Sequence, residues 1–110
     1  MIVNRTQEKV VSKGEKICRG MFSQARGLMF CRKQNILMVF EQEKTIALHM
    51  FFVFFPIDVL ILDERRKVVE IKRDFPPFTF WRANEKGKYV VELGYTGEYK
   101  IGDELDFDLA

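Results

Sequence analysis

The side chains that could do chemistry in this 110-residue chain are few, and most of them stand alone in the sequence. His49 is the single histidine and lies within an apolar stretch. Neither serine, Ser12 or Ser23, has the Gly-x-Ser-x-Gly setting of a hydrolase nucleophile. Cys18 and Cys31 have no second Cys or His cluster nearby, so neither a zinc site nor a CxxC redox pair is indicated. No motif therefore points to nucleophilic, metal-dependent or redox catalysis, and we expect no metal and no cofactor.

Asp58 stands out because it lies within an apolar strand pattern, with Leu60 and Leu62 on its own face. A buried carboxylate that lacks a partner costs several kcal/mol. We therefore expect a partner for Asp58, either backbone N–H groups freed where the chain bends at Pro56 or the guanidinium group of Arg26. An acid that pins this bend is the interpretation we favour, and ligand binding by Asp58 is the alternative.

The stretch HMFFVFFPIDVLIL, residues 49–62, is the most apolar part of the chain. Its uncharged run, residues 45–57, is too short for a membrane-spanning helix, which needs roughly 20 residues. Phenylalanine and β-branched residues favour strands, and Pro56 would interrupt a helix. We predict two strands that meet at Pro56, no membrane insertion, and a Phe-rich first strand covered on both faces because both faces are apolar.

The hydrophobic pattern as a whole predicts a mainly β (β-rich α+β) domain of about eight short strands, in a small barrel-like or sandwich arrangement. Apolar residues at helical spacing, followed by Gly27, predict one short helix at residues 18–28. Length and composition predict a single domain over residues 1–110.

The order of the expected elements follows from the turn residues between the apolar runs. The segment FPPFTFW, residues 75–81, is expected to be a loop or an edge because of its two prolines, and it could act as a lid. The other expected elements are a strand at 1–5, a hairpin at 8–17 turning at Lys13–Gly14, a hairpin at 35–52 turning at 41–44, strands at 57–62 and 68–74 joined by the charged turn 63–67, turns at 84–87 and 94–97, and a final strand at 104–110 with an acidic outer face.

Charge is unevenly distributed along the chain. Residues 1–33 hold eight Lys/Arg and two Glu, a net of +6, whereas residues 98–110 hold one Lys and five Asp/Glu, a net of −4. The positive charges are spread along strands with few interleaved aromatic residues, so nucleic-acid binding is not favoured. The amino-terminal sequence MIVNRTQEKVV becomes polar within five residues, unlike a signal peptide, and a cytoplasmic location is expected. In that compartment both thiols are expected to be reduced, the alternative being a disulfide.

Several short motifs occur in an order that resembles the uncharacterised family called domain of unknown function 192, in its archaeal form. They are Arg26-Gly27-Leu28-Met29, His49-Met50-Phe51-Phe52-Val53, Pro56-Ile57-Asp58-Val59, Val68-Val69, Glu92-Leu93 and Gly102-Asp103. The resemblance implies a compact, β-rich, barrel-like domain with a short helix and no established activity. It supplies no catalytic residue. Many bacterial members have Trp-Met-Lys-Asn-Thr at positions 49–53, so a polar site formed by that Lys-Asn pair would be missing here.

Three hypotheses for function follow, and binding is favoured over catalysis. In the first, the chain is a binding module for a small molecule or a peptide, with a pocket or groove lined by Arg26, Met29, His49, Asp58 and Trp81. In the second, His49 and Asp58 form the proton-transfer pair of an enzyme, which requires them to share a cleft. In the third, exposed aromatic residues form the interface of a homodimer.

Overall fold

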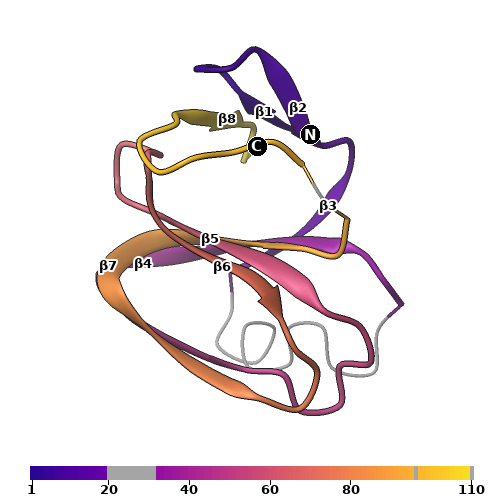
Figure 1. Cartoon of the computed structure of the whole chain (residues 1–110). Helices are drawn as coiled ribbons and strands as arrows, with labels where there is room; N and C mark the ends of the chain where they lie inside the picture. Colours follow the sequence, from indigo (N-terminus) through magenta and orange to yellow (C-terminus); the bar gives the residue numbers. More distant parts are fainter. Residues whose placement is uncertain (20–31, 96, 110) are drawn as a thin grey trace.

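The computed structural model describes residues 1–19, 32–95 and 97–109, and these residues form eight strands in two sheets (Figure 1). The small sheet has the strand order β2-β1-β8, and the large sheet has the order β3-β4-β7-β5-β6. The strands are β1 (Ile2–Asn4), β2 (Lys9–Ser12), β3 (Glu15–Cys18), β4 (Asn35–His49), β5 (Ile57–Leu62), β6 (Val68–Phe75), β7 (Phe80–Leu93) and β8 (Leu105–Phe107).

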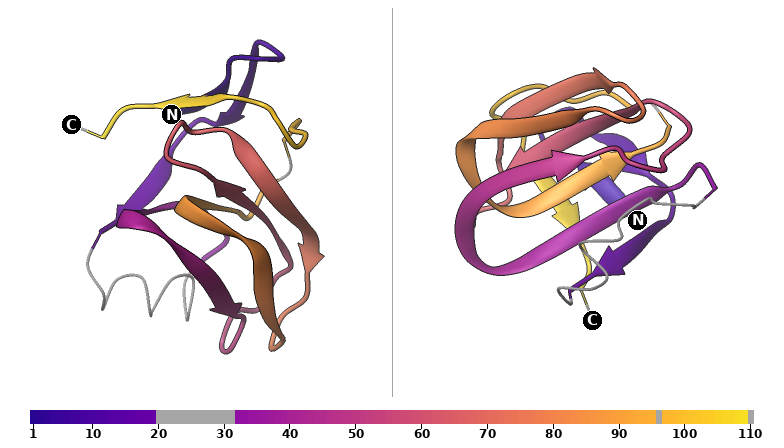
Figure 2. Two further views of the ribbon diagram at one scale, coloured as in Figure 1. Left: turned by 90° about the vertical axis from the view of Figure 1, so that its left-hand side faces the viewer. Right: turned by 90° about the horizontal axis from the view of Figure 1, so that it is seen from below.

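The small sheet lies across one face of the large sheet, as the views in Figure 2 show. Side chains from both sheets meet there in an apolar inter-sheet cluster. The prediction of a mainly β domain is confirmed, and of the two predicted architectures the structure shows the sandwich-like one. The buried members of the inter-sheet cluster are Ile2, Val11, Leu37, Leu60, Leu62, Val68, Tyr89, Val91, Leu93, Tyr99, Leu105 and Phe107.

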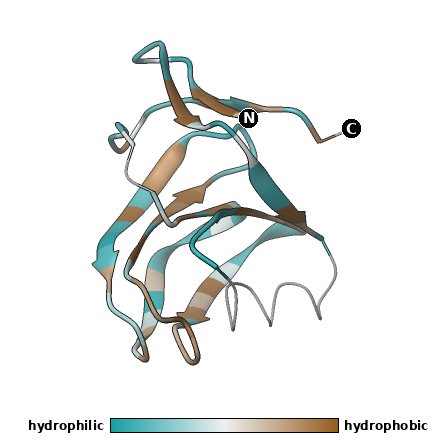
Figure 3. Cartoon of the chain, turned by 90° about the vertical axis from the view of Figure 1, so that its right-hand side faces the viewer, coloured by the Kyte–Doolittle hydropathy of each residue, from teal (hydrophilic) through white to brown (hydrophobic). Residues whose placement is uncertain are grey.

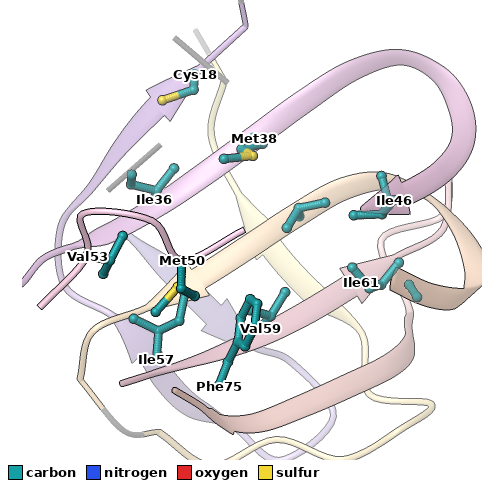
Figure 4. Packing of buried hydrophobic residues seen from close by; sticks show 12 residues of the cluster. Cys18, Ile36, Met38, Ile46, Met50, Val53, Ile57, Val59, Ile61 and Phe75 are labelled. Atoms are coloured by element: carbon teal, nitrogen blue, oxygen red, sulfur yellow. The ribbon is translucent and has the colours of Figure 1, made fainter. Parts of the chain in front are cut away.

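The opposite face of the large sheet carries a second apolar cluster, which the sheet covers by bending over itself (Figure 4). Strands β4 and β7 pair along their length, and their register shifts between Val39 and Lys44 and again between Thr45 and Ala47. We call this second group the bend cluster. Its buried members are Cys18, Ile36, Met38, Ile46, Met50, Val53, Ile57, Val59, Ile61, Phe75, Ala83 and Val90.

Gly87 permits this bend because a Cβ atom at that position would lie only 2.4 Å from Cγ2 of Ile61. The predictions of turns at residues 41–44 and 84–87 are therefore wrong, since both segments belong to the continuous strands β4 and β7. Residues 41–45 are exposed on the outside of the bend. The ladder is interrupted at these residues and their side chains are solvated, so the segment carries the charged residues that are also typical of a turn.

The predicted hairpin at residues 8–17 is also wrong. Lys13 and Gly14 do join two strands, but β2 pairs with β1 in the small sheet and β3 pairs in parallel with β4 in the large one. Cys18 ends β3 and does not begin a helix. The remainder of the predicted helix at 18–28, from residue 20 onward, lies outside the described residues, as does Cys31. No helix within the described residues is long and apolar enough to cross a membrane.

The predicted Phe-rich strand before Pro56 is a loop, and the prediction that both of its faces are covered is wrong. Met50 and Val53 are buried, but the rings of Phe51, Phe52 and Phe54 are exposed. Figure 3 shows that hydrophobic colouring continues into the loops at the lower end of the molecule. The predicted strand at residues 57–62 does form β5, and every residue of it is buried because the two clusters cover its two faces.

The first and last strands of the fold are neighbours, because β1 pairs with both β2 and β8. Asp103 fixes this junction. One of its carboxylate oxygens accepts hydrogen bonds from Asn4 Nδ2 (2.7 Å), Gln7 Nε2 (2.7 Å) and the Lys100 backbone N–H (2.8 Å). Burial alone would raise the pKa of Asp103, but these hydrogen bonds and the charge of Lys100 lower it below its ordinary value.

Glu92 is a buried acid on the face of the large sheet that carries the bend cluster. It lies directly opposite Ile36 on β4 and Val59 on β5, so the three side chains share one face of the sheet. Only 5% of Glu92 is exposed. Burial raises its pKa from an ordinary value of 4.5 to about 7. The folded protein therefore holds a proton on Glu92 at pH values where the unfolded chain has released it.

We predict that this proton makes stability depend on pH. The contribution of Glu92 is fully present below pH 4.5 and is lost as the pH rises through about 7, a decrease of roughly 3 kcal/mol in the free energy of unfolding. Glu92→Gln, which cannot ionise, should lack this decrease. Urea unfolding of both proteins below pH 4.5 and above pH 7 measures the difference, and a difference that does not change with pH would contradict the prediction.

Candidate functional site

His49 is the last residue of β4, lies opposite Phe80 of β7 and is half-buried. Its Nδ1 accepts a hydrogen bond from the Phe51 backbone N–H (3.3 Å), and its ring stacks on the Phe51 ring with the centroids 5.1 Å apart. His49 therefore belongs to the group of aromatic side chains at the outer end of the β4–β7 ladder.

Asp58, the second residue of β5, faces the space between the sheets and is only 6% exposed. One carboxylate oxygen accepts a hydrogen bond from the Asp74 backbone N–H (2.9 Å), and the other accepts one from the Tyr99 hydroxyl. Arg73 lies 3.6 Å from that second oxygen. Arg26, the cation that we expected from the sequence, lies outside the described residues. Sequence reasoning did not identify Tyr99 or Arg73.

Tyr99 is held in place as a hydrogen-bond donor to Asp58. Burial, together with the hydrogen bond to Asp58 and the negative charge of Asp58, raises the pKa of the Tyr99 hydroxyl, so the hydroxyl keeps its proton. The guanidinium of Arg73 lies 4.6 Å from the centre of the Tyr99 ring and donates a hydrogen bond to the Tyr99 carbonyl (3.0 Å). Asp58 thus connects the ends of β5 and β6 to the segment that precedes β8.

The proposed catalytic pair is not brought together by any described contact. His49 bonds and stacks with Phe51, whereas the partners of Asp58 are Tyr99, Asp74 and Arg73. Within the described part of the chain, no group of three His, Cys, Asp or Glu residues could hold a metal ion. Met29, like Arg26, lies outside that part.

Trp81 is half-buried and packs edge-to-face against Phe75, with ring centroids 6.2 Å apart, at the margin of the bend cluster. It neighbours Phe80 on β7, and successive residues of a strand point to opposite faces. The predicted loop or edge at 75–81 is correct for Phe75, which ends the edge strand β6, and for the loop 76–79. Phe80 and Trp81 instead belong to β7, which is a central strand.

Five phenylalanine rings, which we call the aromatic surface, lie exposed at the outer end of the β4–β7 ladder. Their exposed fractions are between 45% and 65%. The Phe78 ring makes edge-to-face contacts with Phe54 (centroids 5.4 Å apart) and Phe52 (6.1 Å apart). The aromatic surface consists of Phe51, Phe52, Phe54, Phe78 and Phe80.

Backbone hydrogen bonds hold the two loops of the aromatic surface together. The Met50 N–H donates to the Thr79 carbonyl and the Phe78 N–H donates to the Met50 carbonyl, both at 2.7 Å. Phe52 and Phe78 have φ angles of 59° and 60°, in the left-handed region. Such a conformation costs a bulky residue of the order of 1–3 kcal/mol. The one feature of the sequence that could have indicated these exposed rings was the occurrence of Phe on both faces of the predicted strand.

We predict a graded loss of stability around Asp58. Asp58→Ala should lower the free energy of unfolding by about 3 kcal/mol, because it leaves the Tyr99 hydroxyl and the Asp74 N–H without an acceptor. Tyr99→Phe should cost about 2 kcal/mol. Arg73→Ala should cost less than about 1 kcal/mol, because the Arg73 side chain is 54% exposed and solvent screens its charge. Urea unfolding tests this order, and a larger loss for Arg73→Ala than for Tyr99→Phe would contradict it.

Comparison with known proteins shows the family to which the chain belongs. The model of the family DUF192, described as an uncharacterized ACR, matches residues 3–107. A UPF0127 protein of Thermococcus sibiricus is 35% identical over 99% of this chain and 75% of its own length. A UPF0127 protein of Thermococcus gammatolerans is 31% identical over 99% of this chain and 76% of its own length.

Two solved structures share the fold. A protein of unknown function from Novosphingobium aromaticivorans has a TM-score of 0.82 and 20% identity, covering 96% of this chain and 82% of its own. A putative transcription regulator from Sinorhizobium meliloti has a TM-score of 0.83 and 18% identity, covering 96% of this chain and 88% of its own. At these identities the likeness concerns the fold alone. The family match over nearly the whole chain and the archaeal relatives show that the chain belongs to the DUF192 family, whose function is unknown.

Proposed function

We propose that the domain is a binding module whose aromatic surface binds a short apolar segment of a partner protein. The observation that carries this proposal is the set of five phenylalanine rings, each about half exposed or more, gathered in two adjoining loops and at the start of β7. Single exposed apolar residues are ordinary, but a contiguous apolar patch on a folded domain marks an interaction site.

The backbone of the two loops supports the proposal. Phe52 and Phe78 both adopt left-handed conformations that are costly for phenylalanine. These conformations set edge-to-face ring pairs at the surface of the domain, where the rings stay about half exposed. Unfavourable backbone conformations persist where the surrounding structure holds them, and they concentrate at functional sites.

The size of the aromatic surface favours a short segment over a second copy of this chain. An aromatic side chain buries about 150–250 Å² when fully covered, so five half-exposed rings offer roughly 500 Å². A stable protein interface of standard size buries roughly 800 Å² on each partner. The available area is therefore smaller than a stable homodimer needs, and it suits a peptide whose few apolar side chains pack between the rings.

A positive charge next to the aromatic surface indicates which charge the bound segment carries. Arg82 is exposed on β7 two residues after Phe80 and so points to the same face of the strand. An acidic residue next to the apolar residues of the partner would pair with Arg82. We also propose a cytoplasmic location.

Selection of peptides from a random library, followed by fluorescence polarisation with the selected sequences, tests the proposal. We expect enrichment of peptides that combine large apolar residues with an acidic residue. The double variant Phe54→Ser/Phe80→Ser should weaken their binding at least about tenfold, the loss typical when a central contact is removed. Ile101→Ser is the matched control, because Ile101 is 68% exposed and lies outside the aromatic surface.

Two results would overturn the proposal. One is a set of selected peptides whose affinity is the same for the wild type and for Phe54→Ser/Phe80→Ser. The other is a stable dimer of the wild-type protein, measured by light scattering, that the same double variant dissociates, since this would assign the aromatic surface to self-association.

A further inference from the structure

A polar cavity at another part of the surface, where β5, β6 and β7 come together, carries a second binding inference. Its volume is about 250 Å³, slightly below the usual range for ligand pockets, so its ligand is small. None of the five rings of the aromatic surface lines it. The lining residues on which the inference depends are Lys33, Ile57, Asp58, Asp74, Leu93 and Tyr95.

Carboxylates line the side of the cavity that β5 and β6 form. Asp58 is buried and its orientation is fixed by Tyr99 and by the Asp74 backbone N–H. Arg73 lies 3.6 Å from one of its oxygens. A carboxylate has about four acceptor positions, so these three partners leave acceptor capacity for a ligand. Asp74 is exposed, and its φ angle of 49° is one that Asp and Asn tolerate. Both aspartates line this side of the cavity, and negative charges favour a cationic group close to them.

A lysine occupies the other side of the cavity, just before β4. Lys33 Nζ lies 5.1 Å from the centre of the Tyr95 ring, and the Tyr95 hydroxyl donates a hydrogen bond to the Lys33 carbonyl (3.1 Å). Gly94 keeps the chains close at this point, since a Cβ there would lie 2.7 Å from the carbonyl oxygen of Gln34 and 3.0 Å from Cγ of Lys33. The backbone of Lys33 is thus held in place before any ligand arrives, which reduces the entropic cost of binding.

The strand order separates the two charges. Lys33 precedes β4, whereas Asp58 is on β5, and β7 lies between these strands in the sheet. Neighbouring strands are about 4.8 Å apart, so two spacings separate the backbone positions of the opposite charges by roughly 10 Å. The ammonium and carboxylate of a free α-amino acid are attached to one carbon atom, so they fit backbone positions this far apart less well than charged groups on two different residues. The ends of a dipeptide are farther apart.

We propose that this cavity binds a small zwitterion of dipeptide length, with its ammonium group at Asp58 and Asp74 and its carboxylate at Lys33. Ile57 and Leu93 line the cavity between the charged sides and contact the ligand's short apolar side chains. The site is separate from the aromatic surface, so it does not depend on the function proposed above.

Titration of the ¹⁵N-labelled protein with Ala-Ala, followed by NMR, tests the proposal. We expect chemical-shift changes at residues 56–58, 74 and 93–95 that saturate at millimolar ligand. N-acetyl-Ala-Ala lacks the ammonium group and Ala-Ala-amide lacks the carboxylate, and each should bind about tenfold more weakly, the loss expected for one charge-assisted hydrogen bond.

Matched variants remove one charge of the cavity at a time. Asp74→Asn and Lys33→Gln should each weaken Ala-Ala binding about tenfold. The controls Glu64→Gln and Lys67→Gln remove the same charges from exposed positions in the turn between β5 and β6 and should bind as the wild type does. Phe54→Ser/Phe80→Ser should also bind normally, which separates this test from the peptide test. Equal binding of Ala-Ala and its blocked forms, shifts located elsewhere, or no shifts at all would overturn the proposal.

Discussion

The bend in the paired strands β4 and β7 is the constraint on which the rest of the structure depends. A straight ladder would leave the bend cluster open on one side, because Ile46 and Ala83 cover it only after the chain has turned. The close contact between Gly87 and Ile61 makes that turn possible. The bend also carries the end of β4 and the start of β7 away from the small sheet (Figure 1). The loops at 50–55 and 76–79, which hold four of the five exposed rings, lie at these strand ends.

Sequence patterns predicted the strands whose environment is uniform along their length. All residues of β5 are apolar except Asp58, and β8 alternates apolar and acidic residues, so both could be located from the sequence. The bent strands β4 and β7 could not be located in this way. Their hydrophobic pattern changes where the ladder shifts register, and charged residues such as Glu41 and Glu85 lie exposed on the outer side of the bend. Local signals also could not show that β2 and β3 pair in different sheets, since the difference depends on partners far along the chain.

The candidate sites were predictable only in part, for a similar reason. The apolar neighbours of Asp58 indicated that it is buried, but its partner Tyr99 is 41 positions away and has no local signal. The exposure of Phe51 and Phe54 was not predictable, because hydrophobicity alone predicts burial. The left-handed turn at Phe52 and the hydrogen bonds of Met50 with Phe78 and Thr79 place these rings outside. Lys33 and Tyr95 come into contact only because the start of β4 pairs with the end of β7.

The junction between the first and last strands has a consequence for biosynthesis. Asn4 and Asp103, which bond across that junction, are 99 positions apart in the sequence. Until β8 has left the ribosome, β1 and β2 form at most an isolated two-stranded ribbon, which is marginally stable in water. The small sheet can therefore assemble only after β8 has been synthesised, although β1 and β2 are the first strands of the chain to be made.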